Sequence, residues 1–510
     1  MSVSIGAGTE MERYLRALEL VGKLPSGQWE VRPFGPRELS AMRLPERHPW
    51  ARQFSDTSPA PRSTWSVVSP SASLIANSGF AYGFNDGPVW AGKGITAVLT
   101  GGITARRSGF SVVLDPVAFV AQNVAFGLAA TGLSGVGVYG DRFTPGAIDQ
   151  PQRFGASVYR RLAPGESHFR WDGHGLAVGV ATESEVWGPA YEHPIILGNN
   201  AGGFPRAFAG TSAPIDLGFM TVHGRILWGR LDESAFGPDI GNERRHFATG
   251  ATATIGVKGF PGLELGGARF FHTTWPQNGL NHAPWFRVFQ EFIRSDLAQN
   301  SGNSFGTNPD NQLASVFMRW APPGAGIEVY GEYGREDRNS EWRDFFQEPD
   351  HDGAYLLGIA RAWTNTADDR VTVVRAEILN SRISHLQQSR GQVPWYVHGV
   401  PSNGHTEGGQ VLASVGGHGG GAFSAAVDRY SASGRTTIRL DRVVWATPLT
   451  AQGLPIAQHV DVTQAIGVER ARYVRRGEVT VAATFVKEFN RYFSSDAVNA
   501  NVAVSFRVLR

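Results

Sequence analysis

Glutamates recur at even spacing along residues 327–336. Because alternate residues of an extended strand point to the same side, Glu328, Glu332 and Glu336 share one face, and the opposite face is apolar. Arg319, on the preceding predicted strand, is expected to point to the same side as these carboxylates. A glycosidase needs two carboxyl groups at a defined separation across a bond. The alternative, which we favour, is a lumen network of Glu–Arg pairs that braces the wall of a barrel.

Aromatic residues stand in long segments rich in glycine, asparagine and proline. Flat rings can stack on the C–H face of a sugar, while nearby polar groups bind its hydroxyls. The alternative is the interfacial girdle of aromatic residues that membrane barrels carry. The candidates for polysaccharide contact are Trp275, Trp285, Trp342, Trp395, Tyr396 and His398.

Other reactive patterns are weak. The chain has no cysteine, which removes thiolate metal sites and cysteine nucleophiles. Gly135–Gly140 matches a nucleotide-binding glycine pattern, but Pro145 stops the helix that phosphate binding would need. His398, His405 and His418 could bind a divalent metal, and ordinary hydrogen bonding is the alternative. We therefore expect no catalytic residue, no cofactor and no metal, so the chain is predicted not to be an enzyme.

Composition points toward a membrane barrel. Charged residues make up 18% of the chain, against about a quarter in a typical soluble domain, yet apolar residues are an ordinary 42%. Aromatic residues reach 11%. Strands that alternate apolar and polar residues, with aromatics at two interfaces, have these proportions. The formal charge of +2 and the lack of a basic stripe give no support for nucleic acid as a partner.

The C-terminus shows a two-residue period. Val502, Val504, Phe506 and Val508 alternate with small or polar residues, so one face is apolar and is expected to meet lipid. Asn501, Ser505 and Arg507 are expected to face inward. Tight turns separate several such strands, and long stretches such as 273–312, 381–420 and 447–460 separate others. Short turns at one end and long loops at the other are typical of outer-membrane barrels.

The predicted fold is all-β: a closed antiparallel transmembrane β-barrel of about 18 strands, with a small N-terminal α-helical periplasmic region and a loop plug. Residues 1–60 form the helical region and linker, because Thr9 and Glu12 make a capping box before an apolar helical face. Residues 61–510 form the barrel and its extracellular loops. Residues 116–140 lack charge but contain too many glycines for a spanning helix. No signal peptide is visible, which argues against export.

Four groups of residues resemble the capsule assembly protein Wzi family. The first is the N-terminal helix with Trp29 and Arg32-Pro33, and the second is Trp187-Gly-Pro189 followed by Leu197–Ala201 and Phe204-Pro205. The third is Val329–Asp337, and the fourth is Tyr396-Val-His398 with the glycines of 404–417. Residues 450–497 match only as generic barrel strand.

The resemblance implies an eighteen-stranded barrel, closed by folded loops, that acts as a lectin and ties capsular or extracellular polysaccharide to the cell surface. It also implies a place in the bacterial outer membrane, with outer-membrane lipid and the barrel-assembly machinery as further partners. The alternative functions are a porin-like channel for small solutes or oligosaccharides, which needs an open lumen, and a barrel hydrolase, which needs a catalytic constellation.

Overall fold

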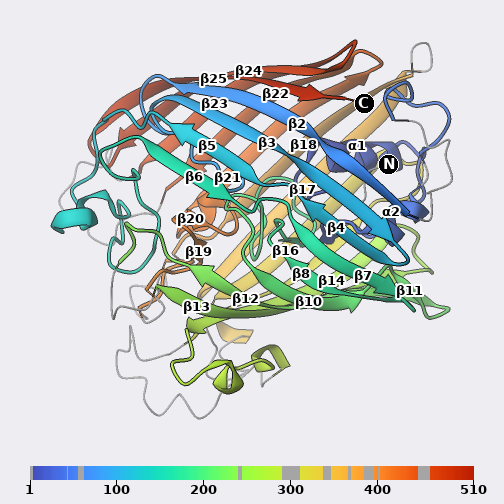
Figure 1. The fold of residues 1–510 in the computed structure, drawn as a ribbon, viewed down its shortest axis with the longest axis horizontal. Helices are drawn as coiled ribbons and strands as arrows, with labels where there is room; N and C mark the ends of the chain where they lie inside the picture. The colour runs from blue at the N-terminus through green and yellow to red at the C-terminus, as the bar shows by residue number, and fades with distance from the viewer. Residues whose placement is uncertain are drawn as a thin grey trace.

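The computed structural model describes residues 4–42, 44–54, 63–238, 244–289, 310–336, 346–365, 369–383, 394–399, 402–445 and 460–509. Over these ranges the chain forms a closed antiparallel barrel of eighteen wall strands, which confirms the predicted fold (Figure 1). Among the described residues, no helix is long and apolar enough to cross a membrane.

Neighbouring wall strands pair antiparallel in chain order, and the last strand closes the barrel on the first through pairs such as Ala72 with Phe506. Three wall strands are each broken into two pieces: β4 with β5, β6 with β7, and β10 with β11. The strands are β2 (Ser63–Asn77), β3 (Gly94–Arg107), β4 (Phe110–Leu114), β5 (Val117–Ala121), β6 (Tyr159–Ala163), β7 (His168–Gly173), β8 (Leu176–Ala181), β10 (Arg206–Thr211), β11 (Ile215–Asp216), β12 (Met220–Asp232), β13 (Arg245–Val257), β14 (Leu263–Thr274), β15 (Asp310–Trp320), β16 (Ile327–Glu336), β17 (Gly353–Asn365), β18 (Arg370–Asn380), β21 (Gly421–Ser431), β22 (Gly434–Val444), β23 (Val462–Val474), β24 (Gly477–Arg491) and β25 (Ser495–Val508).

The outer surface of the wall is apolar. On β25, the side chains of Val502, Val504 and Phe506 are exposed on the outside, while Asn499, at an odd-numbered position of the same strand, is buried inside. The same alternation places Val481 and Phe485 of β24 on the outside. An apolar outer band over a polar interior is the pattern of a membrane-spanning barrel.

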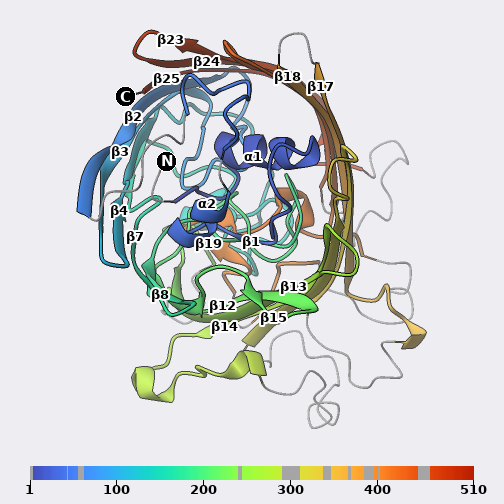
Figure 2. The same ribbon diagram turned by 90° about the vertical axis from the view of Figure 1, so that its right-hand side faces the viewer.

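The two ends of the barrel differ. Tight turns such as 258–262, 321–326 and 475–476 lie at the end that holds the N-terminus, which we call the cap end (Figure 2). Helix α1 (Glu10–Leu20) begins at Thr9, whose side chain accepts the Glu12 N–H, and its apolar face packs on Ala362 and Val373 of the wall. The short strand β1 (Val31–Arg32) and helix α2 (Pro36–Ala41) complete this cap. We call the opposite end, with the long connections, the loop end.

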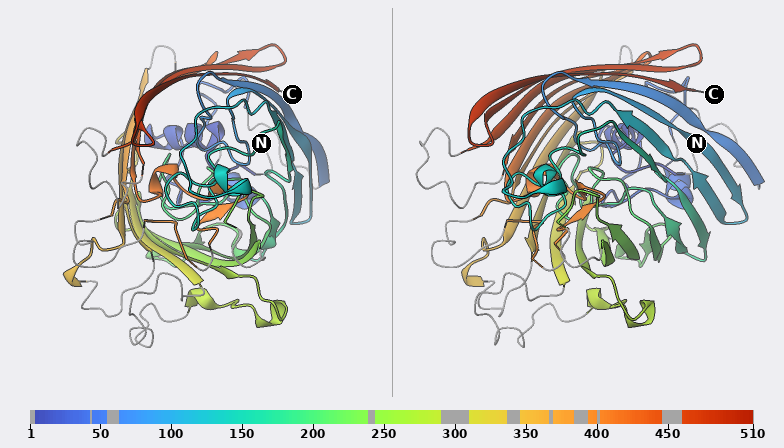
Figure 3. Two further views of the ribbon diagram at one scale, coloured as in Figure 1. Left: turned by 90° about the vertical axis from the view of Figure 1, so that its left-hand side faces the viewer. Right: turned by 60° about the vertical axis from the view of Figure 1, so that its left-hand side comes forward.

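Several connections from the loop end fold into the lumen and form a plug (Figure 3). Strand β9 (Val186–Trp187) pairs with β1 of the cap, and β19 (Thr406–Glu407) pairs with β20 (Gln410–Val411) in a small hairpin. Four short 3-10 helices lie in the connections of the described chain, at Gly135–Tyr139, Leu280–His282, Arg287–Phe289 and Val415–Gly417. A continuous apolar core joins Trp187, Ile195 and Phe204 of the plug to Phe270 and Leu356 of the wall.

The wall has a notch toward the loop end. Strand β8 ends at Ala181 and β10 begins only at Arg206, so neither extends along the upper part of the wall. Within the described ranges, β6 pairs with β5 on one edge and with no strand on the other. The β19–β20 hairpin is visible between β6 and β12, where the two strands diverge (Figure 1). Plug residues therefore complete the wall at this point.

Candidate functional site

A buried ion network joins the cap to the wall. Arg319 of β15 is fully buried and contacts three carboxylates: Glu328 on β16, Glu264 Oε1 at 2.5 Å and Glu19 Oε2 of α1 at 2.6 Å. Arg16 of α1 also binds Glu328, at 2.7 Å. Two arginines thus share the charge of three glutamates from separate segments, and the pairing offsets the cost of burying them. The network has the arrangement of a brace between the cap and the wall.

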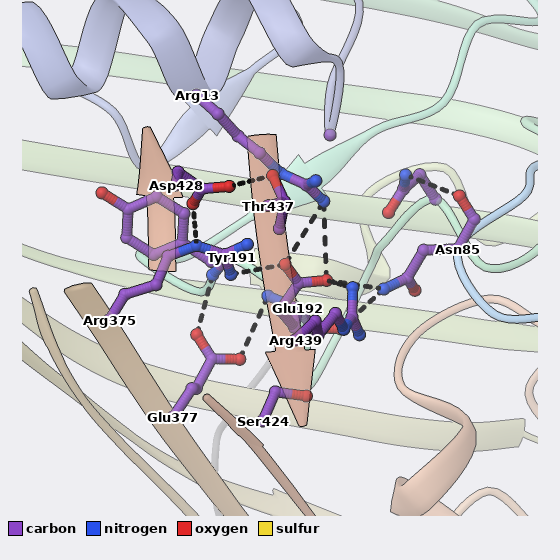
Figure 4. Close-up of polar contacts among 12 residues, drawn as sticks. Arg13, Asn85, Tyr191, Glu192, Arg375, Glu377, Ser424, Asp428, Thr437 and Arg439 are labelled. Atoms are coloured by element: carbon purple, nitrogen blue, oxygen red, sulfur yellow. Dashed lines mark hydrogen bonds and ion pairs between the residues drawn. The ribbon is translucent and has the colours of Figure 1, made fainter. Parts of the chain in front are cut away.

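A second network surrounds Glu192 of the plug (Figure 4). Arg375 contacts its carboxylate at 2.6 Å, Arg439 at 2.8 Å and Arg13 at 3.3 Å. Burial alone would raise the pKa of Glu192, but these three guanidinium groups hold it well below its usual range. A neighbouring carboxylate, Glu377, accepts the backbone N–H of Tyr191, Glu192 and His193 at 2.6–3.1 Å. Together these contacts fix the plug to β18 and β22.

The remaining two predicted lumen carboxylates have different neighbours. Glu336 accepts the backbone N–H of Tyr396 at 2.7 Å and an Nδ2–H of Asn311 at 3.1 Å, so it holds the segment that carries the predicted aromatic cluster. Glu332 is buried beside Gly188 of the plug. The four predicted polar residues therefore contact the cap and the plug at separate places along β15 and β16.

Trp395 and Tyr396 lie inside the plug. Their side chains are 1% and 0% exposed, Trp395 Nε1 donates to Asp352 O at 3.1 Å, and the Tyr396 hydroxyl donates to Ile195 O at 2.7 Å. His398 is also buried, and its backbone N–H donates to Ala147 O at 3.2 Å. Rings placed in this way present no free face to a ligand, so a role of these residues in glycan contact stays a prediction that would require the plug to open.

Trp275 and Trp285 are half-buried and lie outside the wall. The segment 275–289 after β14 folds back over the outer face of β12 and β13, where Trp285 packs on Phe247 at a ring distance of 5.2 Å. Trp228 Nε1 donates to Trp285 O at 2.7 Å. Trp342 lies outside the described residues.

A pocket with a cavity volume of about 150 Å³ lies at the loop end, between the plug and strands β22 to β24. We call it the loop pocket. Its aromatic lining is Phe80, Tyr82, Phe84, Trp90, Trp445 and Tyr492, and its polar lining includes Arg142, Gln150, Gln152, Gln410, Glu488 and Arg491. Rings beside amide and charged side chains are the lining that a sugar requires.

Ion pairs and stacking hold the side chains of the loop pocket in place. The Arg142 guanidinium lies 3.9 Å from the centroid of the Trp445 ring and contacts Glu488 Oε1 at 2.7 Å. Trp445 Nε1 donates to Thr463 Oγ1 at 2.8 Å. Arg491 stacks over Phe80 at 4.1 Å and also contacts Glu488. Each arginine therefore keeps one face on a ring and directs its N–H groups at a shared carboxylate, which leaves a rigid, prearranged surface.

Sequence reasoning does not single out the loop pocket. Its residues come from several separate connections, and none of them forms a local motif. One signal points to it: Trp445 stands at the end of an alternating strand, immediately before one of the predicted long loops. Among the described residues, no group of three or more His, Asp or Glu side chains is placed to hold a metal ion. His405 contacts Ile196 O at 2.6 Å and His418 contacts Thr144 Oγ1 at 3.1 Å, so these two histidines have separate partners.

Comparison with known structures gives a likeness over the whole chain. The chain is similar to Wzi of Escherichia coli, described as an outer membrane protein involved in group 1 capsule assembly and a carbohydrate-binding β-barrel, with a TM-score of 0.63, 14% identity and 99% of each chain covered. A BenF-like porin from Pseudomonas fluorescens Pf-5 has a TM-score of 0.39, at 10% identity, over 88% of this chain and 98% of its own. Pseudomonas aeruginosa OccK2, solved with glucuronate, has a TM-score of 0.40, at 10% identity, over 88% and 96%.

No curated protein sequence matches the chain. The family described as "Capsule assembly protein Wzi" matches residues 131–441, which run from the first long connection of the plug to β22 and include Glu192, Arg319 and the Trp395–His398 segment. This is more than half of the chain, and the barrel, the N-terminal cap and the inward-folded loops agree with it. The chain belongs to the capsule assembly protein Wzi family.

Proposed function

We propose that this barrel lies in the bacterial outer membrane and binds capsular or other extracellular polysaccharide at the cell surface, without cleaving it. The observation that carries the proposal is the loop pocket, where Arg142 and Arg491 lie against aromatic rings at the end of the barrel that holds the long connections. Family membership, and the carbohydrate binding described for E. coli Wzi, support it.

The loop pocket suits binding better than chemistry. Two carboxylates line it. Glu488 is occupied by Arg142 and Arg491, and Asp141 accepts the backbone N–H of Phe143 and Thr144, so neither is an unpaired acid or base for a glycosidic bond. Stacked rings each contribute about 0.5–1.5 kcal/mol, and a polymer that offers many copies of one unit adds such weak contacts through effective concentration. A shallow pocket is therefore sufficient to retain a long chain. Outer-membrane lipid and the barrel-assembly machinery are the further partners that such a barrel requires.

The test uses the full chain in detergent with purified capsular polysaccharide immobilised on beads. Trp445→Ala removes the ring under Arg142, and we expect retention to fall several-fold, with partial recovery in Trp445→Phe. The matched control is Trp363→Ala, because Trp363 is exposed on the outside of β17 and lies away from the pocket. Equal retention by the two alanine variants would contradict binding at the loop pocket. Appearance of shortened glycan on incubation would contradict binding without cleavage.

A further inference from the structure

A second concave feature lies on the outside of the wall, below the notch. It is a groove of about 770 Å³, which we call the wall groove. Outward-facing residues of several strands line it, among them Leu114, Phe169, Val180, Ala207 and Trp228. It faces away from the lumen, so it is separate from the loop pocket.

Segment 275–289 forms the outer lip of the wall groove. Many outward-facing apolar side chains of the wall are exposed, but Phe247 and Phe271 are buried beneath this segment, at 3% and 4% exposure. Trp275, Leu280 and Trp285 close the groove on this side. The groove has room at this place because β8 and β10 are short strands, so the wall ends early between them. The result is a channel open to the apolar phase around the barrel rather than a flat wall.

Two arginines lie at the loop end of the wall groove, Arg230 in its lining and Arg245 beside it. Arg230 lines it and pairs with Asp232 at 2.8 Å, with side chains that are 43% and 36% exposed. Arg245 lies opposite Asp232 on the adjacent strand, with its guanidinium 5.5 Å from the Trp275 ring. Guanidinium groups have several donors each and match phosphate geometry, so an anion can bind here while Asp232 keeps its pairing. The half-buried Trp275 and Trp285 offer ring faces that suit a sugar.

We propose that the wall groove binds an acylated saccharide phosphate from the surrounding membrane leaflet. An acyl chain occupies the apolar groove. There it contacts Trp228 and Val180 instead of the loosely packed chains of neighbouring lipids. The phosphorylated sugar lies at the loop end, against Arg230, Arg245 and the two tryptophans. A phospholipid would fill the groove equally well but would leave the tryptophan faces without a sugar. The proposal depends on the membrane placement of the barrel and not on glycan binding in the loop pocket.

The test is native mass spectrometry of the full chain, released from dodecyl maltoside micelles that contain purified lipid A, a diglucosamine phosphate with several acyl chains. Ala207→Phe fills the groove with an apolar ring, and we expect bound lipid A to fall at least fivefold. Ala483→Phe is the matched control, because Ala483 is exposed on the outside of β24, between Val481 and Phe485. Both variants keep an apolar outer wall. Equal lipid A retention by the two would overturn the proposal.

Two further arms decide the headgroup. Arg230→Gln is expected to reduce bound lipid A severalfold, against no change in Arg442→Gln, whose arginine is exposed at the loop end of β22 across the barrel. This arm also decides the matter if Ala207→Phe fails to fold, as judged by heat-modifiable electrophoretic mobility. In the second arm, the micelles contain phosphatidylglycerol in place of lipid A. Equal retention of the two lipids would overturn the proposal that the groove recognises a saccharide headgroup. Polysaccharide retention by the Ala207→Phe variant is expected to stay unchanged, which separates this site from the loop pocket.

Discussion

Gly408 donates its backbone N–H to Asp232 O at 2.7 Å, and this bond joins the tip of the β19–β20 hairpin to the end of β12. The Asp232 N–H in turn donates to Glu407 Oε2 at 2.8 Å. On the other side of the notch, Arg161 of β6 donates to Gly408 O at 3.5 Å. Gly408 has a φ of +55°, which glycine adopts without strain. A plug hairpin thus takes the place of a missing strand edge in the upper wall.

The first prediction concerns the pH dependence of this hairpin. Burial raises the pKa of Glu407 to about 8, because it outweighs the hydrogen bond from the Asp232 backbone N–H, which favours the charged form; the Asp232 carboxylate adds to the rise. A carboxyl group whose folded pKa is raised contributes stability that is present below its unfolded pKa of about 4.3 and is lost as pH rises through 8. Glu407→Gln cannot ionise, so its free energy of unfolding is expected to exceed that of the native chain by about 1–3 kcal/mol at alkaline pH, with a much smaller gap in mild acid.

Thermal unfolding midpoints at about pH 5 and about pH 8.5, on the two sides of the titration, measure this effect. Asp216→Asn is the control, because Asp216 is an exposed carboxylate that pairs with Lys258 at the cap end. The difference in unfolding midpoint between Asp216→Asn and the native chain is expected to be the same at the two pH values. A constant difference between Glu407→Gln and the native chain across this range would show that Glu407 titrates normally.

The second prediction concerns the brace between cap and wall. Arg319→Met leaves Glu19, Glu264 and Glu328 short of a positive partner in a buried place, and removal of one partner from a buried ion network costs about 3–5 kcal/mol. We expect a lower unfolding midpoint and faster proteolysis of α1, since Glu19 belongs to that helix. Arg361→Met is the control, because the exposed Arg361 binds only Ala325 O among the described atoms. Equal proteolysis of the two variants would mean that Arg319 does not hold the cap on the wall.

The third prediction distinguishes residues that stabilise the plug from residues that contact the polysaccharide. Trp395→Ala and Tyr396→Ala each open a cavity in a packed interior, at a cost of about 3–5 kcal/mol. In these two variants, any loss of polysaccharide retention is expected to accompany a lower unfolding midpoint. In Trp445→Ala, retention is expected to fall while the midpoint stays nearly unchanged. The measurement is retention against unfolding midpoint for the three variants. Loss of retention in Tyr396→Ala without any shift of the midpoint would place the plug aromatics in the binding surface.

The sequence predicted relationships that depend on local geometry. The two-residue period places Arg319 and Glu328 on one face of adjacent strands, and the short turn between them sets the register. It could not predict Glu19 and Glu264 as partners of Arg319, because these contacts depend on how the cap docks. The sequence also could not predict that the segment around Tyr396 folds inward, since loops that enter the lumen and loops that extend outward can have the same composition of glycine and aromatic residues. Glu192 carries the same lesson: three arginines reach it from α1, β18 and β22, and only the tertiary fold brings them together.

The fourth prediction tests the facing of the wall where the strand pattern is plainest. Val504 is exposed on the outside of β25, and Ser505, the next residue, points to the other side and pairs with Ser73 of β2. An arginine that meets hydrocarbon near the middle of the membrane costs about 2–4 kcal/mol, whereas one in the polar interior keeps its hydration or finds a carboxylate. Val504→Arg is therefore expected to reduce the fraction of chain that folds into phosphatidylcholine vesicles, measured by heat-modifiable electrophoretic mobility, and Ser505→Arg is expected to fold nearly as well as the native chain. Because the two substitutions add the same side chain at neighbouring positions of one strand, they differ only in the face that receives the charge, and equal folding of both would mean that this wall does not meet lipid.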